Sequence, residues 1–544
     1  MNNSCKSVSK LRNSWRNHNL CKIFEKSLLK DKTLNYVILH RHNSQAICVH
    51  KNRGKLFSKK YCFGRKLSNF HHGPEYGRHS FMAEEEITDE AATKILREHE
   101  MSMVMKEDFD SKNLNPVVGF DSNILPSNSP LEDRRAQAKF HHNTDLGMLF
   151  GVFDGHGGHQ CANAVCDRLF MYLALALLPH KDLSVTLRDL DSGKPWPALL
   201  EWYQHSKLPP GKSLRPHQVQ RLRRFMEKRL SGEIVISNIE DAMHHVCIEL
   251  DSDILIDAQK QTVYKMLKHA RPDLAAIDCA MSGAVACFAH ISQDIITVAN
   301  IGDCRAVLGS RDMVKKDRWI ATPLSRKHNA MNEEEKQRIY SEHPEFERGN
   351  IIKNERLLGS LAPFRAFGNA RFKWPAKTIN EVAFLSTDSD DDIGVGGDYR
   401  IPDQSNWVLP FYRSPPYLTA KPDIIQHEIQ PNDAFLVLAT DGLWETMHKH
   451  YVIQLIGEQI DRMEGKTDMN NADISASDIL DTDSAFFGFE DTNAATNIIR
   501  HCIGQTFDGS SRRQVRSMLN LPQRESRFYR DDITVTVVKF NPLG

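Results

Sequence analysis

Three apolar stretches of this 544-residue chain each end on an aspartate that stands next to a glycine. The pairs are Asp154-Gly155, Gly302-Asp303 and Asp441-Gly442. Two further acids, Glu132 and Asp531, flank predicted strands near the two ends of the folded part. If these strands pack together, five carboxylates meet in one cleft, and such a cluster persists only when cations neutralise it. A ligand set made only of oxygens favours Mg²⁺ or Mn²⁺ over zinc.

A pair of divalent ions would define a reaction class. Two metals can activate a water as the nucleophile that attacks phosphorus, and they neutralise the oxygens of a phosphate ester during in-line displacement. His156 follows Asp154 by two residues and is placed to protonate the leaving alkoxide as a general acid. These residues together indicate a phosphomonoester hydrolase. An ordinary alternative stays open, because an Asp-Gly pair after a strand is most often a turn and a lone histidine is most often a surface residue.

The elements that must position these acids are mainly strands that follow one another along the chain. Short apolar runs predict the strands, and longer runs of helical period predict two helices between them. The predicted strands cover 148–153, 282–291, 295–301, 435–440 and 533–540, and the helices cover 160–178 and 239–268. Because helices cluster between strands of antiparallel type, the pattern favours an α+β fold over a doubly wound sheet.

Composition excludes several classes of protein. Hydrophobic residues make up 40% and charged residues 26% of the chain, which is the balance of an ordinary globular protein. The formal net charge is +0, so the whole molecule offers no electrostatic case for binding nucleic acid. No apolar run is long enough to predict a transmembrane segment. The 11 cysteines form no Cys-x-x-Cys pair, which argues against a zinc module and a secreted disulfide framework.

Positive charge is concentrated at the start of the chain. Residues 1–80 carry 17 Lys and Arg against the three acids Glu25, Asp31 and Glu75. A basic, acid-poor composition is typical of mitochondrial transit peptides. Residues 1–75 are therefore predicted to be a mitochondrial targeting segment that is disordered or cleaved. A basic arm that binds nucleic acid or acidic lipid is the alternative.

The acids lie in seven short motifs that follow one another along residues 112–541. The motifs are LEDR (131–134), FGVFDGHGG (150–158), SGA (282–284), ANIGDCRA (299–306), RAFG (365–368), LATDGLW (438–444) and RDDIT (530–534). In type and order they resemble the metal-dependent serine/threonine phosphatases of the PPM, or type 2C, family. The resemblance implies a β-sandwich of two antiparallel sheets flanked by antiparallel helices, with a two-metal site at one edge. Polar stretches near 180–232, 375–415 and 462–494 are expected to be insertions in this domain.

The resemblance also implies a role for each acid. Asp154 would bridge two Mg²⁺ or Mn²⁺ ions, and the carbonyl of Gly155 would bind one of them. Glu132 would belong to one ion, and Asp441 and Asp531 to the other. Asp303 and Glu445 would form a third, weaker metal site, and His156 takes the position of the general acid.

Three positions depart from the family pattern. Glu445 is one methylene longer than the aspartate found in many members. Asn128 stands where many members carry an arginine that binds the substrate phosphate, and Asn369 follows RAFG where aspartate is usual. We expect Asn128 to contact the phosphate, with weaker binding than an arginine would give. We still expect activity, because no primary metal ligand is lost.

Longer stretches narrow the resemblance to the catalytic subunits of pyruvate dehydrogenase phosphatases. The similar segments are 115–135, 356–368, 372–374, 415–422 and 443–447. They imply a phosphoserine substrate on the pyruvate dehydrogenase α subunit, whose dephosphorylation activates the pyruvate dehydrogenase complex in the mitochondrial matrix. They also imply docking to the lipoyl domain of the dihydrolipoyl acetyltransferase core, a Ca²⁺ ion at a partner interface and a regulatory subunit. Two alternatives stay open: a mitochondrial phosphatase with another client, and a weakly active scaffold.

Overall fold

The computed structural model divides the chain into two compact units, residues 1–82 and residues 83–544. It describes residues 38–42, 45–52, 55–62, 87–105, 116–141, 147–195, 197–203, 215–266, 273–315, 318–385, 407–465, 490–506 and 509–541. The first unit contains an antiparallel sheet of β1 (Ile38–His42), β2 (Gln45–Asn52) and β3 (Lys55–Cys62). These strands fall within residues 1–75, which were expected to be disordered or cleaved, and the targeting role of this segment stays a prediction.

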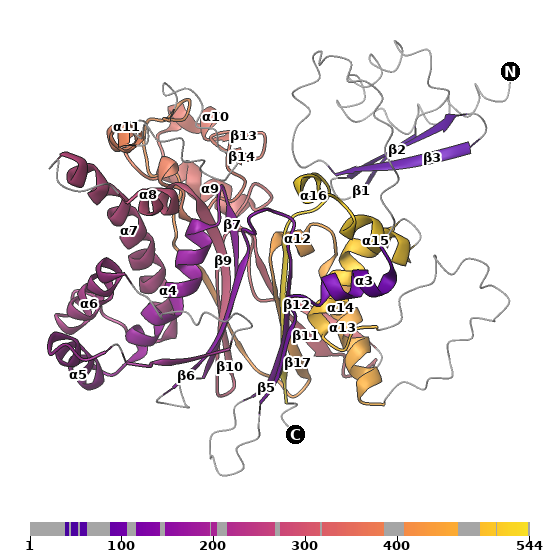
Figure 1. The fold of residues 1–544 in the computed structure, drawn as a ribbon, viewed down its shortest axis with the longest axis horizontal. Helices are drawn as coiled ribbons and strands as arrows, with labels where there is room; N and C mark the ends of the chain where they lie inside the picture. Colours follow the sequence, from indigo (N-terminus) through magenta and orange to yellow (C-terminus); the bar gives the residue numbers. More distant parts are fainter. Residues whose placement is uncertain are drawn as a thin grey trace. The chain divides into compact units, whose positions relative to one another are not determined.

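The second unit is built around two antiparallel sheets (Figure 1). The first sheet has the order β16 (Asp423–Glu428), β10 (Ile295–Ile301), β9 (Gly283–Ser292), β7 (Met148–His156), β6 (Arg134–Phe140) and β8 (Leu200–Tyr203), and β15 (Phe367–Gly368) pairs with β9. The second sheet has the order β12 (Trp319–Pro323), β11 (Arg305–Arg311), β17 (Asp433–Ala439), β20 (Ile533–Phe540), β5 (Val117–Leu125) and β4 (Met101–Val104). The predicted α+β sandwich of two antiparallel sheets is therefore confirmed.

The core of the sandwich lies between the two sheets. Phe150 of β7 and Cys287 of β9 face Leu436 of β17 and Val538 of β20 in one buried cluster. Leu149 of β7 points the opposite way and joins the cluster beneath the helices, as expected because successive side chains of a strand alternate between faces. Both faces of β7 are covered, which explains why this strand is a continuous apolar run in the sequence.

A helical layer covers the outer face of each sheet (Figure 1). The first sheet is covered by α4 (Gln160–Leu177), α7 (Ile239–Met266) and α8 (Leu274–Met281). The second is covered by α13 (Lys449–Met463), α14 (Ala494–Gly504), α15 (Arg512–Leu519) and α3 (Asp89–Leu96). The layer order is helix, sheet, sheet, helix. No helix among the described residues has the length and apolar character needed to cross a bilayer.

Shorter elements complete the unit. The helices are α9 (Glu333–Glu342), α10 (Arg348–Ile351), α11 (Ala376–Leu385), α12 (Asp441–Trp444) and α16 (Gln523–Tyr529). Two small hairpins pair β13 (Ile352–Lys353) with β14 (Arg356–Leu357) and β18 (Gln505–Thr506) with β19 (Gly509–Ser510).

The polar stretch near 180–232 contributes two helices, α5 (His180–Asp191) and α6 (Pro216–Leu230), and strand β8 at the edge of the first sheet. The basic side chains of α6 are not all turned outward. Arg221 is buried and donates to Asp257 Oδ1 of α7 at 2.8 and 2.9 Å, and Arg229 donates to the carbonyl of Leu175 at 2.7 Å. This stretch is therefore packed onto α4 and α7. Residues 386–406 and 466–489, which make up much of the other two expected insertions, lie outside the described residues.

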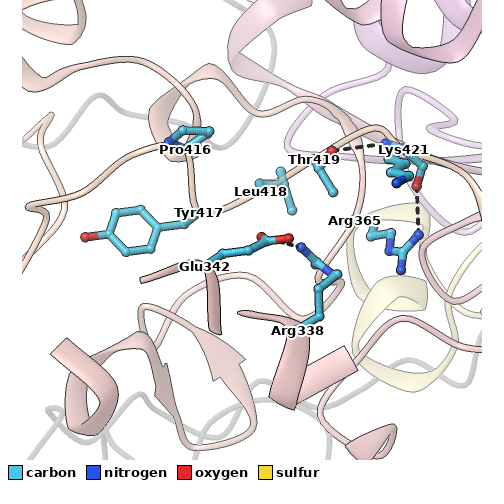
Figure 2. Close-up of a pocket in the computed structure, with 8 residues that line it drawn as sticks. All are labelled: Arg338, Glu342, Arg365, Pro416, Tyr417, Leu418, Thr419 and Lys421. Carbon is cyan, nitrogen blue, oxygen red and sulfur yellow. Dashed lines mark hydrogen bonds and ion pairs between the residues drawn. The ribbon is translucent and has the colours of Figure 1, made fainter. Parts of the chain in front are cut away.

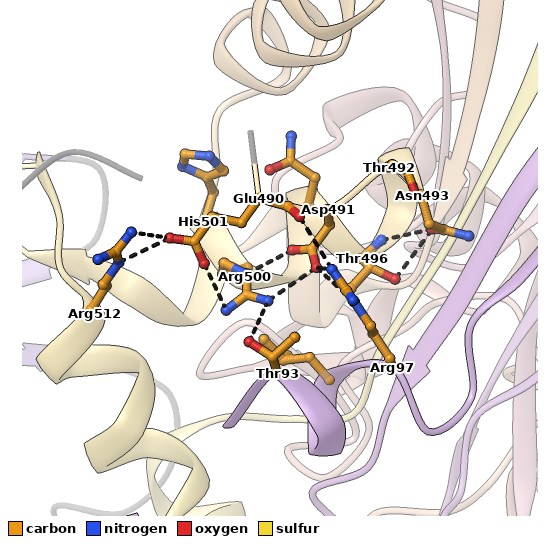
Figure 3. A network of polar contacts seen from close by, with 12 residues as sticks. Thr93, Arg97, Glu490, Asp491, Thr492, Asn493, Thr496, Arg500, His501 and Arg512 are labelled. Carbon is orange, nitrogen blue, oxygen red and sulfur yellow. Dashed lines mark hydrogen bonds and ion pairs between the residues drawn. The ribbon is translucent and has the colours of Figure 1, made fainter. Parts of the chain in front are cut away.

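The sheet begins ahead of residue 112, the start that the motifs suggest for the domain. Strand β4 pairs with β5 at the edge of the second sheet, and α3 precedes it. Figure 3 shows how this segment is held: Arg97 donates to Asp491 at 2.9 Å, and Arg500 of α14 donates to the same carboxylate at 2.6 Å. The side chains of Arg500 and Asp491 are only 3% and 1% exposed. Residues 87–104 are thus fastened to the C-terminal part through Arg97, whose side chain is 42% exposed and which shares the buried carboxylate of Asp491 with Arg500.

Candidate active site

The register of both sheets brings the predicted acids to one edge of the sandwich. In the first sheet, Arg134 at the start of β6 lies opposite Phe153 near the end of β7. In the second, Ala439 at the end of β17 lies opposite both Arg305 and Val535, the latter near the start of β20. Antiparallel pairing places these ends side by side. The acids that stand at or just beyond them are Glu132, Asp154, Asp303, Asp441 and Asp531.

The carboxylates are close enough to repel one another. The pKa of Asp154 is raised well above its ordinary value, first because the group is buried and then because of the charges of Asp441, Asp133 and other nearby acids. The pKa of Asp441 is raised well above its ordinary value for the same reasons, with Asp303 as the strongest repelling neighbour. Like charges that are held together in this way favour the binding of cations.

The donor set fits divalent ions of the Mg²⁺ type, because every predicted ligand is an oxygen. Within the described ranges, no three His, Cys, Asp or Glu side chains surround a single point. Mg²⁺ does not require such a cage, since it keeps several waters and is bound by only one or two carboxylates. The ligand assigned to each ion stays a prediction.

Glu132 is held at this edge of the sandwich by two polar contacts. Its Oε1 accepts a hydrogen bond from the backbone N–H of Gly158 at 2.6 Å, and its Oε2 lies 3.6 Å from Arg527 Nη2. Burial raises the pKa of Glu132, although the charge of Arg527 opposes the shift. A Cβ at Gly155 would lie only 2.4 Å from the Glu132 carbonyl oxygen, so the close approach of β7 to this segment requires glycine.

A second carboxylate of the RDDIT motif organises the segment that carries Glu132. Asp532 Oδ1 accepts from the N–H groups of Ser127 and Asn128 at 2.6 and 2.8 Å. Its Oδ2 accepts from the N–H groups of Glu132 and Asp133 at 2.9 and 3.3 Å. The buried Asp532 therefore fixes the loop by four backbone hydrogen bonds, while its neighbour Asp531 is exposed.

Asp133 is a further buried acid to which the sequence analysis gave no role. Its Oδ2 accepts from the hydroxyls of Thr440 and Thr534 at 2.9 and 2.6 Å, so it links the loop to the strand ends of the second sheet. The sequence carried the same signal for Asp133 and Asp532. The LEDR and RDDIT motifs each place two acids side by side just before a strand, so each motif holds one acid more than its predicted metal ligand.

Asn128 lies in the site, beside a predicted metal ligand. Its Nδ2 donates to Asp531 Oδ1 at 3.0 Å, and its Oδ1 is buried with no hydrogen-bond partner among the described residues. The side chain is 5% exposed. The amide is thus held against Asp531, and its contact with substrate phosphate stays a prediction.

His156 and Asn369 form a pair that the motifs alone did not reveal. Strand β7 continues to His156, beyond the turn expected at Asp154. Because Asp154 and His156 are two residues apart in this strand, their side chains leave the same face of it. His156 Nε2 is 2.7 Å from Asn369 Oδ1, and Asn369 has a left-handed backbone with φ 50°. Asn369, which the sequence marks only as a departure from the family's usual aspartate, therefore orients the predicted general acid.

The two acids proposed for a third ion, Asp303 and Glu445, both lie near Asp441. Burial raises the pKa of Asp303, while Lys327 and a hydrogen bond from the Asn329 side chain oppose that shift. Glu445 is exposed at the end of α12, and its charge contributes to the raised pKa of Asp441. The two acids therefore share a neighbour, and their binding of a third ion stays a prediction.

The arginine of the RAFG motif has a structural partner. Arg365 donates from Nε and Nη2 to both oxygens of Glu335 at 2.8 and 2.7 Å, and Arg338 donates to the same carboxylate. Figure 2 shows Arg365 and Arg338 beside a cavity of about 250 Å³, whose wall includes Tyr417 and Lys421. Both guanidinium groups are already bonded to protein oxygens, so this motif braces a loop against α9.

A comparison with protein families agrees with this geometry. The model of the family described as Protein phosphatase 2C matches residues 213–507. That span includes Asp303, Asp441 and Glu445, whereas Glu132, Asp154 and Asp531 lie outside it. The family match alone therefore does not bring the acids inside residues 213–507 together with those outside. That they meet at one edge follows from the pairing of the strands.

Curated relatives match over most of their length. The chain is 38% identical over 466 residues to mitochondrial pyruvate dehydrogenase (acetyl-transferring) phosphatase 1 of Rattus norvegicus, covering 84% of this chain and 83% of that protein. It is 37% identical over 471 residues to phosphatase 1 of Homo sapiens, with the same two shares. It is 36% identical over 463 residues to mitochondrial phosphatase 2 of Homo sapiens, covering 84% of each chain. With the acids gathered at one edge of an antiparallel sandwich, these matches show that the chain belongs to the protein phosphatase 2C family and is a protein serine/threonine phosphatase.

Proposed function

We propose that this phosphatase removes phosphate from phosphoserine on the pyruvate dehydrogenase α subunit, and so activates the pyruvate dehydrogenase complex in the mitochondrial matrix. The observation that carries this proposal is the extended identity to relatives that are named as mitochondrial pyruvate dehydrogenase phosphatases. The match runs through 83% of the rat protein, so it is not confined to the metal-binding motifs. The basic start of the chain supports a mitochondrial location.

The site would hold two Mg²⁺ or Mn²⁺ ions. The residues proposed to bind them are Asp154, Gly155 through its carbonyl, Glu132, Asp441 and Asp531, with Asp303 and Glu445 at a third position. When bound, the ions would supply an activated water and neutralise charge on the phosphate oxygens.

The chain itself supplies orientation and a proton. His156 donates a proton to the serine oxygen as the phosphorus–oxygen bond breaks, and Asn369 holds the imidazole ring in position through the 2.7 Å contact. The bond from Gly158 to Glu132 and the cradle around Asp532 keep the carboxylates in place before substrate arrives. Such positioning lowers the barrier because the reacting groups are already oriented.

The resemblance to pyruvate dehydrogenase phosphatases also supports three partners for this chain. We propose docking to the lipoyl domain of the dihydrolipoyl acetyltransferase core, a Ca²⁺ ion at that interface, and a regulatory subunit. Copurification with the isolated lipoyl domain, with and without Ca²⁺, tests the first two. Loss of the complex on chelation is the expected result.

The client is tested by measuring phosphate release from phosphorylated pyruvate dehydrogenase and from a generic phosphoserine peptide, each with Mg²⁺ or Mn²⁺. Preferential release from the dehydrogenase that stops on adding a chelator is expected. Equal rates on both substrates would contradict pyruvate dehydrogenase as the preferred substrate and favour a phosphatase that acts on another phosphoprotein. Absence of release with either metal would favour the scaffold alternative.

The metal site is tested by Asp154→Asn. Turnover that depends on added metal should disappear, while the fold should persist, because the change removes a buried charge that its neighbours repel. Circular dichroism and thermal unfolding check the fold. Asp182→Asn, on the exposed surface of α5, is the matched control. Unchanged turnover in Asp154→Asn would contradict the proposed site.

A further inference from the structure

A cleft lined by carboxylates repels a phosphate group unless cations that the protein has not already neutralised face the substrate. The other arginines considered near these acids are bonded to protein oxygens or have buried donor atoms. Arg134 donates to Asn163 Oδ1 and to the carbonyls of Leu131 and Asp133, and Arg365 is bonded to Glu335. Arg530 buries its Nε and Nη1 atoms, so a substrate cannot reach them.

Arg527 differs from these residues in exposure and in contacts. Its side chain is 43% exposed, and among the described residues its recorded polar contact is the one to Glu132, at 3.6 Å. Only the Arg527 end of this pair is exposed, because the side chain of Glu132 is 9% exposed. The 3.6 Å separation is too long for a hydrogen bond, so the guanidinium is free to turn toward an incoming anion.

The backbone beneath Arg527 is fixed to the loop that carries Asn128. The buried Ser526 donates from its hydroxyl to the Ser127 carbonyl at 2.7 Å, and Ser127 Oγ donates to the Arg530 carbonyl at 2.8 Å. These reciprocal bonds clamp α16 to the same loop that Asp532 holds. Arg527 therefore extends from a rigid base toward Glu132, and the Asn128 amide lies on Asp531 in the same site.

We propose that Arg527 binds the phosphate group of the substrate and supplies the positive charge that Asn128 lacks. This role rests on the site proposed above, but not on the identity of the client. A guanidinium suits the task because its planar set of N–H donors matches two phosphate oxygens at once. Arg527 would turn from Glu132 to the phosphate as substrate enters.

The test is Arg527→Ala, assayed on a phosphoserine peptide and on p-nitrophenyl phosphate. Loss of a charge-assisted contact is expected to raise KM on both substrates about tenfold to a hundredfold. The inhibition constant of inorganic phosphate should rise by a similar factor, and calorimetric titration with inorganic phosphate in the presence of Mg²⁺ should show the same weakening. The concentration of Mg²⁺ needed for half-maximal activity should stay unchanged.

Two variants serve as controls. Arg524→Ala removes an exposed arginine one turn earlier on α16, and its KM values should match those of the unaltered chain. Arg527→Lys keeps the charge without the paired donors, so its KM should lie between those of the unaltered chain and Arg527→Ala.

Other outcomes would overturn the proposal. A raised Mg²⁺ requirement with unchanged phosphate inhibition would mean that Arg527 only supports Glu132. A raised KM on the peptide alone would mean that Arg527 contacts the residues around the phosphoserine. Neither substrate contains pyruvate dehydrogenase, so these results do not depend on whether the pyruvate dehydrogenase assay succeeds.

Discussion

Gly283, the first residue of β9, lies against the pair formed by His156 and Asn369. A Cβ at this position would be 2.1 Å from Asn369 Oδ1 and 2.2 Å from His156 Nε2. Neither atom is the end of a long flexible side chain, so both groups would have to move. The absence of a side chain at Gly283 thus leaves the space that His156, the predicted general acid, and Asn369 occupy.

Gly283→Ala should therefore impair catalysis more than folding. If His156 is displaced, turnover of a phosphoserine peptide should fall by about a hundredfold or more, which is the usual contribution of general acid–base catalysis. Turnover of p-nitrophenyl phosphate should fall less, because its leaving group needs little protonation. Steady-state kinetics on both substrates measure the difference. Gly349→Ala is the control, since a Cβ there meets nothing within 4 Å.

Single residues also mark how far the sequence could predict the site. The position of Asp154, Asp441 and Asp531 at the strand ends could be predicted because each stands next to a strand in a recognisable motif, and their role as metal ligands stays a prediction. The contact of His156 with Asn369 joins residues 213 positions apart, and that of Arg527 with Glu132 joins the two ends of the domain. Such contacts depend on the packing of the two sheets, which motif spacing does not encode.

At the scale of secondary-structure elements, α9 and the RAFG loop are joined by one carboxylate. Burial would raise the pKa of Glu335, but hydrogen bonds and charge from Arg365 and Arg338 lower it to about 2. Because the pKa in the folded state lies below the ordinary value of 4.5, the ionised group stabilises the fold at neutral pH. This stabilisation is present above about pH 4.5 and is lost as the pH falls toward 2.

Glu335→Gln should reduce the free energy of unfolding at pH 7 by about 3 kcal/mol. The difference between the variant and the unaltered chain should shrink below pH 4.5 and vanish near pH 2. Urea unfolding at a series of pH values measures it, and the difference isolates Glu335 from other titrating acids. A difference that does not change with pH would show that the carboxylate charge is not responsible.

The edge of the second sheet depends on another buried pair. Asp491 accepts from Arg500 and Arg97 (Figure 3), so Asp491→Ala would leave the buried Arg500 without its main partner. Removing one member of a buried pair typically costs about 3–5 kcal/mol. Thermal and urea unfolding should show this loss. Asp189→Ala, which breaks an exposed pair with Lys194, should cost less than about 1 kcal/mol.

The sequence predicted most central elements but not this edge. Strands β7, β9, β17 and β20 could be identified because they are long apolar runs, buried on both faces or nearly so. Strand β4 has only four residues and alternates between half-buried and exposed positions, so it lacks a strong periodic signal. Its place is fixed by long-range contacts with β5 and α14.

At the scale of the whole molecule, the predicted acids come together only because two sheets end at the same edge. Glu132 and Asp154 come from the first sheet, and Asp441 and Asp531 from the second. Asp133 and Asp532 lie where the sheets meet and bond to residues of both sides. Stability of the sandwich and integrity of the site are therefore coupled, and loss of an edge strand should affect both.

Two truncated chains test where the catalytic unit begins. A chain that starts at residue 83 keeps α3 and β4, and it should retain the unfolding temperature and metal-dependent turnover of the second unit. A chain that starts at residue 112 loses the buried side chains of Ala92 and Leu96, the pairing of β4 with β5, and the bond from Asn123 Nδ2 to the Leu96 carbonyl. It also leaves Asp491 without Arg97. We expect this shorter chain to unfold at a lower temperature and to lose turnover in proportion to the unfolded fraction. Equal stability of the two chains would instead place the start of the catalytic unit at residue 112, as the motifs predict.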